Sequence, residues 1–431
     1  MRRINIILTI AFFFLASCMN KHADTNSFSG NDTVIVLKTI KHKGFGLLGP
    51  GAFGDLFFTK VNKDVSAFFH VPETIEGVEM KIVFPDFNVP KKVYENGSID
   101  STDYFKWLKK GFIDTTVLKI LSDSKCYLII VKGKINDSTF FIIDQNNNQD
   151  LSDDTLRTFK PIQQNSTASL ISFDYRIDND SDIVPATSWI NIGIYPNGDT
   201  LFCTSQHVSS SFFINDTSYT IAVAPWFGCA FHEYIKFALI EENGLYIDTL
   251  SGINYNKLGD YLKLGNQYYK FESITNDGSY ITLRKEDNFS DLTGTQIGMI
   301  APDFTCCTIN GDSIFSNDYK GKYLLIINVS ACWSKKSSYK CYKDLTEIYN
   351  GEFEYIGIDN SPSILRNNIK SLKLSGPFVI AEDNPMIQAS YRPDYCSRTC
   401  FLIIPEGRII DKFEIFDWDS ILLKHFAKEN L

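Results

Sequence analysis

The sequence predicts a multidomain protein with a β-rich N-terminal region, an antiparallel sandwich or barrel, followed by a C-terminal α/β domain. Three observations predict this class. The chain has 431 residues, enough for more than one packed core. From Thr33 to about Leu283, short β-branched and aromatic runs alternate with turn pairs such as Asn-Gly and Asp-Gly. From Ile297 onward, apolar strand-like runs alternate with helical stretches.

Composition excludes two broad classes. Hydrophobic residues make up 44% of the chain and aromatic residues 14%, which excludes disorder over most of its length. Lys and Arg number 42 against 51 Asp and Glu, giving a formal charge of −9. An acidic chain repels a phosphate backbone, so nucleic acid is excluded as a partner.

The first residues predict export and a lipid anchor. Arg2 and Arg3 precede an apolar stretch from Ile6 to Ala16, which suits a signal peptide and is too short to span a bilayer. Leu15-Ala-Ser-Cys18 resembles the bacterial lipobox, in which the cysteine is acylated. We therefore expect a signal peptide at 1–17, a lipidated Cys18 and a polar tether through residue 32. The membrane is then a partner through the anchor, and the protein faces a cell-envelope compartment outside the cytoplasm, at the outer membrane or the periplasm.

The β-rich region is expected to hold one or two units. A polar seam near residues 160–169 suggests a first domain at 33–164 and a second domain, or a continuation, at 165–290. Two stretches have a weak helical period, Thr102–Lys110 and Tyr234–Glu241. Strand-like runs include Thr33–Lys38, Cys126–Val131, Thr139–Ile143, Thr220–Ala224 and Ser279–Leu283.

A loop after the run at 139–143 has the spacing of a calcium site. Oxygen-bearing side chains recur at every second residue, and Ca²⁺ takes six to eight oxygen ligands. The pattern resembles an EF-hand loop, but its sixth position is Gln149 rather than glycine and its twelfth is Thr155 rather than glutamate. The alternative is an Asn/Asp-rich turn that holds no ion. Ca²⁺ is the one cofactor the sequence suggests, with candidate ligands Asp144, Asn146, Asn148, Asp150 and Asp154, and Asp153 as another candidate for the closing carboxylate.

A second cluster has the residue types of a zinc site. Cys203 and His207, then Cys229 and His232, supply two thiols and two imidazoles. In an exported protein, a Cys203–Cys229 disulfide or two unpaired thiols is the commoner outcome. We expect one of these rather than zinc.

The C-terminal third predicts alternating strands and helices over 297–431. The run ending at Val329 is continuously apolar, as in a buried central strand. Helices are expected near 336–349, 363–372, 383–388 and 418–428, strands near 353–358 and 377–381, and a hairpin from strands at 399–404 and 408–413.

This order of elements resembles the thioredoxin fold of the TlpA and AhpC/TSA family, in the form carried by lipoproteins of Bacteroides-type bacteria. The matching motifs are APDF at Ala301–Phe304, DYKGKYLLI at Asp318–Ile326 and the hairpin at Phe401–Ile409. The resemblance implies a redoxin-type domain. In the family, a W-C-x-x-C motif opens the first long helix, where the helix dipole lowers the pKa of the first thiol.

This chain departs from the family at both cysteine positions. In register it has Trp333-Ser-Lys-Lys-Ser337, so Ser334 and Ser337 replace the cysteines. A serine cannot form the mixed disulfide that thiol exchange requires. The family's cis-proline position is occupied by Arg398. These losses predict a degenerate redox centre with no confident catalytic residue.

Other cysteines leave an alternative open. Cys332 lies two residues before Ser334, and Cys341, Cys396 and Cys400 lie in the same domain. Cys332 paired with Cys396 or Cys400 would form a structural disulfide or a displaced redox couple.

The preferred interpretation is a binding or assembly module rather than an enzyme. Trp333 is a candidate anchor for a protein or peptide partner, and Lys335 and Lys336, with Arg398, are candidate contacts for an acidic one. The alternative is a TlpA-like thiol–disulfide oxidoreductase with an unconventional cysteine pair that includes Cys332.

Overall fold

The computed structural model describes most of the chain after the predicted leader. The predicted signal peptide, Cys18 and most of the tether lie outside the described residues, as does nearly all of the range 102–110. Among the residues that are described, no helix has both the length and the hydropathy to cross a membrane. The described ranges are 26–49, 54–56, 58–61, 63–86, 94–95, 97, 101–102, 125–161, 170–179, 182–195, 198–226, 228–231, 235–241, 256–330, 336–392 and 398–426.

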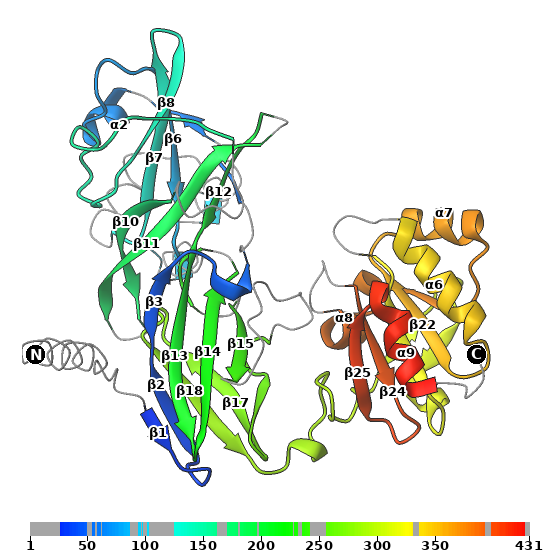
Figure 1. Ribbon diagram of the computed structural model, residues 1–431. Coiled ribbons are helices and arrows are strands. Elements are labelled where there is room, and N and C mark those ends of the chain that lie inside the picture. Colours follow the sequence, from blue (N-terminus) through cyan, green and yellow to red (C-terminus); the bar gives the residue numbers. More distant parts are fainter. Residues whose placement is uncertain are drawn as a thin grey trace, which may run out of the picture.

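Two sheets face each other in one half of the β-rich region (Figure 1). Their alternating apolar residues, among them Ile35, Phe212 and Phe271, form a shared core. One sheet has the order β1 (Asn26–Phe28), β13 (Gln206–Ile214), β14 (Thr217–Pro225), β15 (Ile235–Glu241), with β3 (Ile40–Lys43) also on β13. The other has the order β16 (Tyr261–Leu264), β17 (Gln267–Ile274), β18 (Tyr280–Glu286), β2 (Val34–Lys38).

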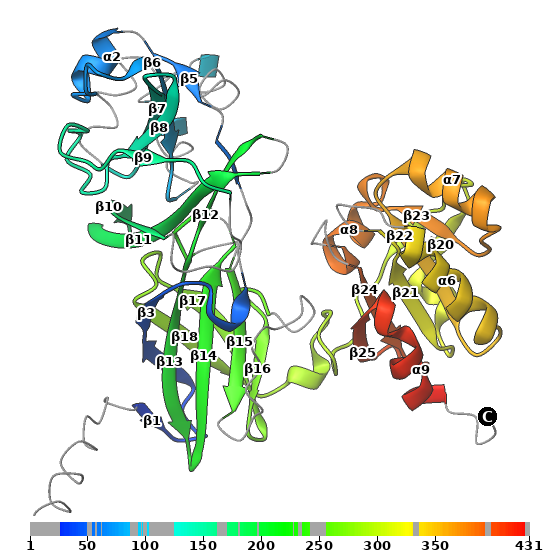
Figure 2. The ribbon, with the colours of Figure 1, turned by 45° about the horizontal axis from the view of Figure 1, so that its top comes forward.

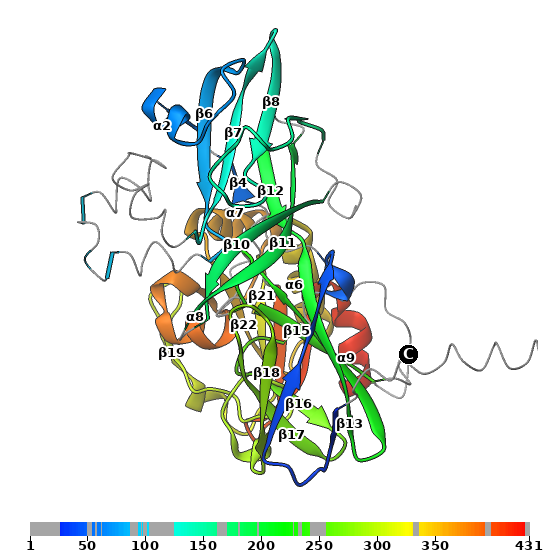
Figure 3. The same cartoon turned by 90° about the vertical axis from the view of Figure 1, so that its left-hand side faces the viewer.

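Two further sheets form the other half, and Figures 1 and 3 show β6 to β8 at the opposite end from β13 and β17. Their shared core includes Ile130, Phe141 and Phe173. One sheet has the order β10 (Ile171–Asp178), β11 (Ile183–Ile194), β12 (Thr200–Thr204), β4 (Gly54–Asp55). The other, covered by α2 (Lys63–Phe68), has the order β5 (Thr59–Lys60), β6 (Glu76–Val83), β7 (Leu128–Ile135), β8 (Ser138–Ile143), β9 (Arg157–Thr158).

The predicted β-rich character is confirmed, with one wrong element. The weak helical period at 234–241 belongs to strand β15, whose Phe237 stacks on Phe271 at 4.4 Å between ring centroids. Strand pairing also crosses the seam expected near residue 164. Strands β1 to β4, all before residue 56, pair with strands from the later range, such as β2 with β18 and β4 with β12.

The C-terminal domain is a five-stranded mixed sheet between two layers (Figure 2). β21 pairs in parallel with β22 and antiparallel with β24. The strand order is β23 (Phe378–Ile380), β22 (Glu354–Asp359), β21 (Leu324–Asn328), β24 (Thr399–Ile403), β25 (Ile409–Glu414). Every residue of β21 is buried, as its continuous apolar run predicts.

Helices cover both faces of this sheet. One face carries α6 (Lys336–Ile348), α7 (Pro362–Leu372) and α9 (Trp418–Phe426), and the other carries α8 (Pro385–Tyr391) and the hairpin β19 (Thr305–Cys307) to β20 (Ser313–Phe315). Short 3-10 turns are η1 (Gly46–Leu48), η3 (Phe289–Asp291), η4 (Ser316–Tyr319), η5 (Ala381–Asp383) and η6 (Ile415–Asp417). The elements predicted for this third of the chain are confirmed to within a few residues at each end.

Candidate functional site

The carboxyl ends of the two parallel strands define the candidate site. β21 ends at Asn328, and α6 begins at Lys336 on the same side of the sheet. β24 runs antiparallel to β21, with Cys400 opposite Ile327, so Arg398 and Thr399 lie at this same edge. The edge is the usual place for a site in an α/β sheet, because strand ends and helix starts meet there.

A buried carboxylate organises the edge from β22. Asp359 is 1% exposed, and its Oδ1 accepts hydrogen bonds from Ser330 Oγ at 2.6 Å and from the Asn360 N–H at 2.6 Å. Its Oδ2 accepts one from the hydroxyl of Tyr339, the fourth residue of α6. Burial and the neighbouring Asp359 carboxylate raise the pKa of Tyr339. Tyr339 therefore stays protonated and holds α6 against β22.

A buried arginine completes the network from the end of α8. Arg392 is 2% exposed, and its guanidinium donates to Asn328 Oδ1 at 2.8 Å and to the Ser330 carbonyl at 2.8 Å. Asn328 donates in turn to the carbonyls of Tyr391, at 3.0 Å, and Thr399, at 2.7 Å. The network ties α8, β21 and β24 together at this edge.

Sequence reasoning missed this network. The available signal was position: Asn328 and Asp359 are the polar last residues of two apolar parallel strands. Parallel strands bring such residues to one edge, where the buried groups must be hydrogen-bonded. Its described hydrogen bonds join strand ends to α6 and α8, so the network holds the edge in place.

The predicted site residues are only partly within the described chain. Ser337 and Lys336 are exposed in the first turn of α6, and the Arg398 guanidinium lies 5.5 Å from the ring centroid of Phe416. Phe416 is 40% exposed, so this cation–π pair is near the surface. Cys332, Trp333, Ser334, Lys335 and Cys396 lie outside the described residues.

Three described thiols in this domain, those of Cys306, Cys341 and Cys400, have raised pKa values, unlike the thiol of a redox nucleophile. Burial raises the pKa of Cys400, which is fully buried in β24, and also that of Cys341 in α6. Burial raises the pKa of Cys306 to about 12. An attacking thiol needs a lowered pKa. Cys306, Cys307, Cys341 and Cys400 are free thiols.

The comparisons with known proteins concern this domain. No family model and no curated protein matches the chain. The chain is similar to a thiol-disulfide oxidoreductase from Bacteroides fragilis, with 20% identity over 29% of this chain and 98% of that chain and a TM-score of 0.26. It is similar to the thioredoxin domain of a thiol-disulfide oxidoreductase from Bacteroides vulgatus, with 26% identity over 30% and 97% of the chains and a TM-score of 0.26. A secreted disulfide oxidoreductase of Mycobacterium tuberculosis has 12% identity over 26% and 82%, with a TM-score of 0.23.

The thioredoxin-like fold predicted from the sequence is confirmed for the C-terminal domain. Its central parallel strands, its antiparallel terminal hairpin and its helices on both faces have the predicted order. The activities printed for the similar structures are those of other proteins.

The predicted calcium loop is held together by hydrogen bonds to the carboxylates of Asp144 and Asp153. Asp144 is 1% exposed, and its two carboxylate oxygens accept the N–H groups of Asn148 at 3.1 Å and Gln149 at 3.0 Å. The Asn146 and Asn148 side chains both donate to Asp153 Oδ2, at 3.1 and 2.9 Å. Asp153, rather than Asp150, is therefore the carboxylate that contacts the side chains of the loop. Asp150 instead accepts a hydrogen bond from Ser152 and lies beside His70.

This loop gathers several carboxylates, two of which have raised pKa values. Burial raises the pKa of Asp144, and burial together with nearby carboxylates raises the pKa of Asp154 to about 6. Among the described residues, no group of three His, Cys, Asp or Glu side chains has the geometry of a metal site. Calcium binding at Asp144, Asn146, Asn148, Asp150 and Asp154 stays a prediction.

The residues of the predicted zinc cluster have other roles. Cys203 and Cys229 are buried free thiols, and burial raises the pKa of each to about 12. His207 Nδ1 bonds to the Gly44 carbonyl at 2.8 Å and its ring stacks on His42. His232 lies outside the described residues. Two unpaired thiols, one of the outcomes expected, is what the structure has.

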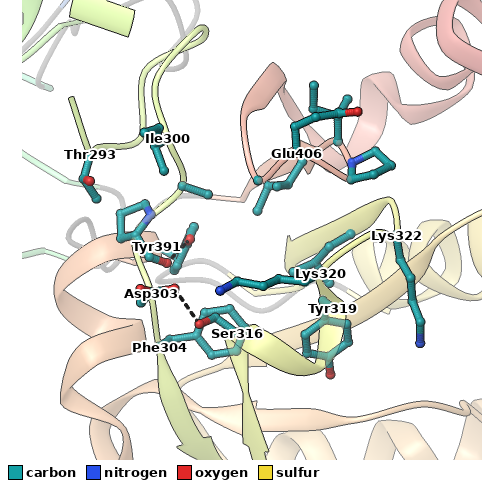
Figure 4. Close-up of a pocket in the computed structure, with 17 residues that line it drawn as sticks. Thr293, Ile300, Asp303, Phe304, Ser316, Tyr319, Lys320, Lys322, Tyr391 and Glu406 are labelled. Atoms are coloured by element: carbon teal, nitrogen blue, oxygen red, sulfur yellow. Dashed lines mark hydrogen bonds between the residues drawn. The ribbon is translucent and has the colours of Figure 1, made fainter. Parts of the chain in front are cut away.

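A cavity of about 370 Å³ opens at the other end of the central sheet (Figure 4). Its wall includes Ile300 near the start of the domain, Tyr319, and Glu406 of the terminal hairpin. The Asp303 carboxylate accepts a hydrogen bond from Ser316 at 2.7 Å, and the Lys320 side chain points toward the opening. The cavity lies at the amino end of β21, away from the edge described above.

Proposed function

We propose that the chain is a lipid-anchored envelope protein whose thioredoxin-like domain binds an acidic peptide segment of a partner and does not transfer electrons through the family's positions. The observation that carries this proposal is Ser337. It presents a hydroxyl at the start of α6, where the resemblance to the TlpA and AhpC/TSA family would put the resolving thiol. Oxygen cannot form the disulfide on which the family's reaction depends.

The chemistry of the edge supports binding. Lys336 and Arg398 bring two cations to one side of the sheet in a protein of net charge −9. The half-exposed ring of Phe416 stacks on Arg398 and adds an apolar surface. Cations beside an aromatic ring suit a partner segment with carboxylates and apolar side chains.

Two assays on the chain from residue 19 test this proposal. In insulin reduction with dithiothreitol, we expect no turnover above the reagent alone. In fluorescence anisotropy, we expect a labelled oligoglutamate peptide to bind, and an oligolysine peptide not to bind. Lys336→Ala combined with Arg398→Ala should weaken binding about two- to tenfold, since each exposed charge contact contributes roughly 0.2–1 kcal/mol.

A matched variant on the same helix serves as the control. Lys340 is exposed one turn beyond Lys336, so Lys340→Ala should leave peptide affinity unchanged. Equal loss in both variants would indicate nonspecific charge attraction and contradict the proposal.

Thiol–disulfide exchange is the second candidate. Cys332 and Cys396 occur in the two sequence segments that flank the site, and a couple between them would replace the missing pair. This candidate, unlike the first, agrees with the activity printed for the similar structures. Insulin turnover that disappears in Cys332→Ser would establish it and overturn the binding proposal.

The anchor is tested separately. In a bacterial host, wild-type protein should incorporate labelled palmitate and sediment with membranes, because Cys18 is acylated. Cys18→Ser should do neither. Labelling that persists in this variant would contradict the proposed anchor.

A further inference from the structure

A cavity that the proposed function does not use lies at the amino end of β21, and three segments of the C-terminal domain form its walls (Figure 4). The first wall is the stretch 300–304, the second is η4 with Lys320 after it, and the third is the hairpin turn 403–407. Backbone N–H to carbonyl hydrogen bonds join each pair of walls: Ser316 to Phe304 at 2.9 Å, Gly321 to Pro405 at 3.2 Å, and Ala301 to Gly407 at 2.8 Å. The cavity is therefore formed before a ligand binds, which lowers the entropic cost of binding.

The floor of the cavity is apolar and is continuous with the core of the domain. Phe304, Leu324 and Ile403 line it, and each of them is at most 5% exposed. On the rim, Ile300 is 38% exposed and Tyr319 is partly exposed. The volume of about 370 Å³ is within the range of small-molecule sites. Because covering the apolar rim is favourable, a ligand that suits this cavity has an apolar side chain.

Groups of opposite charge face each other across the opening. Figure 4 shows the Lys320 side chain pointing toward Asp303, which lies on another wall. Ser316 donates a hydrogen bond to the Asp303 carboxylate at 2.7 Å and holds it in place. Within the described chain Lys320 forms no ion pair, whereas Lys322 pairs with Glu354 at 2.9 Å and points away from the cavity (Figure 4). The opening therefore offers both an ammonium group and a carboxylate to a ligand.

We propose that this cavity binds a small zwitterion with an apolar side chain, either a free amino acid or a dipeptide. The carboxylate of the ligand bonds to Lys320, and its ammonium group bonds to Asp303. The side chain of the ligand covers Ile300 and Tyr319 on the rim. A ligand with a single charge would leave the opposite protein charge partly desolvated and without a partner, which costs free energy. Glu406 adds a second carboxylate to the wall and further disfavours a ligand that is only an anion.

This site is separate from the edge of the proposed acidic-peptide contact. The edge lies at the carboxyl ends of β21 and β22, whereas the cavity lies at the amino end of β21. The two proposals can therefore fail independently. Lys336→Ala combined with Arg398→Ala, which should weaken oligoglutamate binding, should leave binding in the cavity unchanged.

Ligand-observed NMR titrations of the chain from residue 19 test the site, with L-leucine and the dipeptide leucyl-leucine as probes. We expect saturable binding of at least one probe at millimolar concentrations or below, and the tighter probe distinguishes an amino acid from a dipeptide. The amide form of that probe lacks the carboxylate, and the N-acetyl form lacks the ammonium group. Each form should bind at least about tenfold more weakly, because a charge-assisted hydrogen bond is lost. This comparison uses wild-type protein, so it does not depend on how variants fold.

Substitutions assign the binding to the cavity. Lys320→Gln and Asp303→Asn should each weaken binding of the tighter probe about tenfold. Lys322→Gln is the matched control and should leave the affinity unchanged, because Lys322 is paired with Glu354. The proposal is overturned if neither probe binds saturably at millimolar concentrations, or if the forms that lack one charge bind as tightly as the zwitterion. Unchanged affinity in both Lys320→Gln and Asp303→Asn would also overturn it.

Discussion

At the scale of single residues, the loop from Asp144 to Asp154 has more charge than its surroundings favour. Both terminal carboxylates have raised pKa values, in each case because burial penalises the charged form. The Arg157 guanidinium offsets this only in part for Asp154. Without a cation, the ionised loop therefore destabilises the folded state, and a bound cation would remove that effect.

The pKa of Asp154 predicts a pH-dependent gain from its removal. It is about 6 in the folded chain against 3.8 for an ordinary Asp, so the folded state binds the proton more tightly. Its destabilising effect is full above pH 6 and fades as the pH falls toward 3.8. Asp154→Asn should therefore raise the urea midpoint at pH 7.5 and change it little at pH 4. Asp137→Asn, which removes one carboxylate from an exposed hairpin turn, is the control for the loss of a single charge.

Calcium titration follows from the same loop. In calorimetry, we expect heat at calcium concentrations of about 10⁻⁴–10⁻³ M, since the loop lacks a bidentate closing glutamate. Asp144→Ala should abolish the heat, and Asp150→Asn should leave most of it, because Asp150 turns away from the other oxygens. Absence of heat from wild-type protein at millimolar calcium would refute the site.

At the scale of elements, the pattern of apolar residues was most informative in the C-terminal domain. The continuous apolar run of β21 and the helical spacing of α6 and α7 identify those elements from sequence. β15 was mistaken for a helix because Ile235 to Ile240 are almost all apolar and show no alternation. Phe237 and Lys236 are adjacent and both buried, as in a strand that is covered on both of its faces. Only the pairing with β14 shows that the segment is a strand.

The site was less predictable than the fold for a related reason. Ser337 and Arg398 follow from alignment to a motif, but Asp359 and Arg392 are thirty-three positions apart and meet only through the sheet. Neither belongs to a local pattern. A buried network of this kind depends on tertiary contacts. In the sequence, each of its residues therefore looks like an ordinary polar residue at the end of a strand or a helix.

The network predicts a large loss of stability from one substitution. Asp359→Ala leaves the Ser330 hydroxyl, the Tyr339 hydroxyl and a backbone N–H without their acceptor in a buried place. We expect the free energy of unfolding of the domain to fall by about 2–3 kcal/mol or more, measured by urea denaturation. Asp383→Ala, at an exposed carboxylate of η5, should cost much less. Equal effects would show that the network is not specifically stabilising.

At the scale of the whole molecule, one segment joins the β-rich region to the C-terminal domain and bonds to both. Residues 287–300 leave β18 and reach the domain through η3 (Figure 1). On one side Phe289 stacks on Tyr268, with ring centroids 3.8 Å apart. On the other, Arg408 donates to the Ser290 carbonyl at 2.6 Å, and Gly298 N–H donates to Ile409 at 2.8 Å. The segment is therefore a bridge that ring stacking and hydrogen bonds fix to both parts of the chain, rather than a free linker.

Gln296 is the side chain whose loss should loosen this bridge. It accepts the Tyr261 N–H at 2.7 Å and donates to the Tyr261 carbonyl at 3.0 Å, so it pairs with β16 as a short strand would. Gln296→Ala removes both bonds without touching either core. Limited proteolysis should then cut within 287–300 several times faster, while the urea midpoint of the C-terminal domain stays unchanged. Lys263→Ala, exposed on β16, should leave the cutting rate as in wild-type protein. Unchanged cutting in Gln296→Ala would mean that the contacts of Phe289 and Arg408 hold the bridge alone.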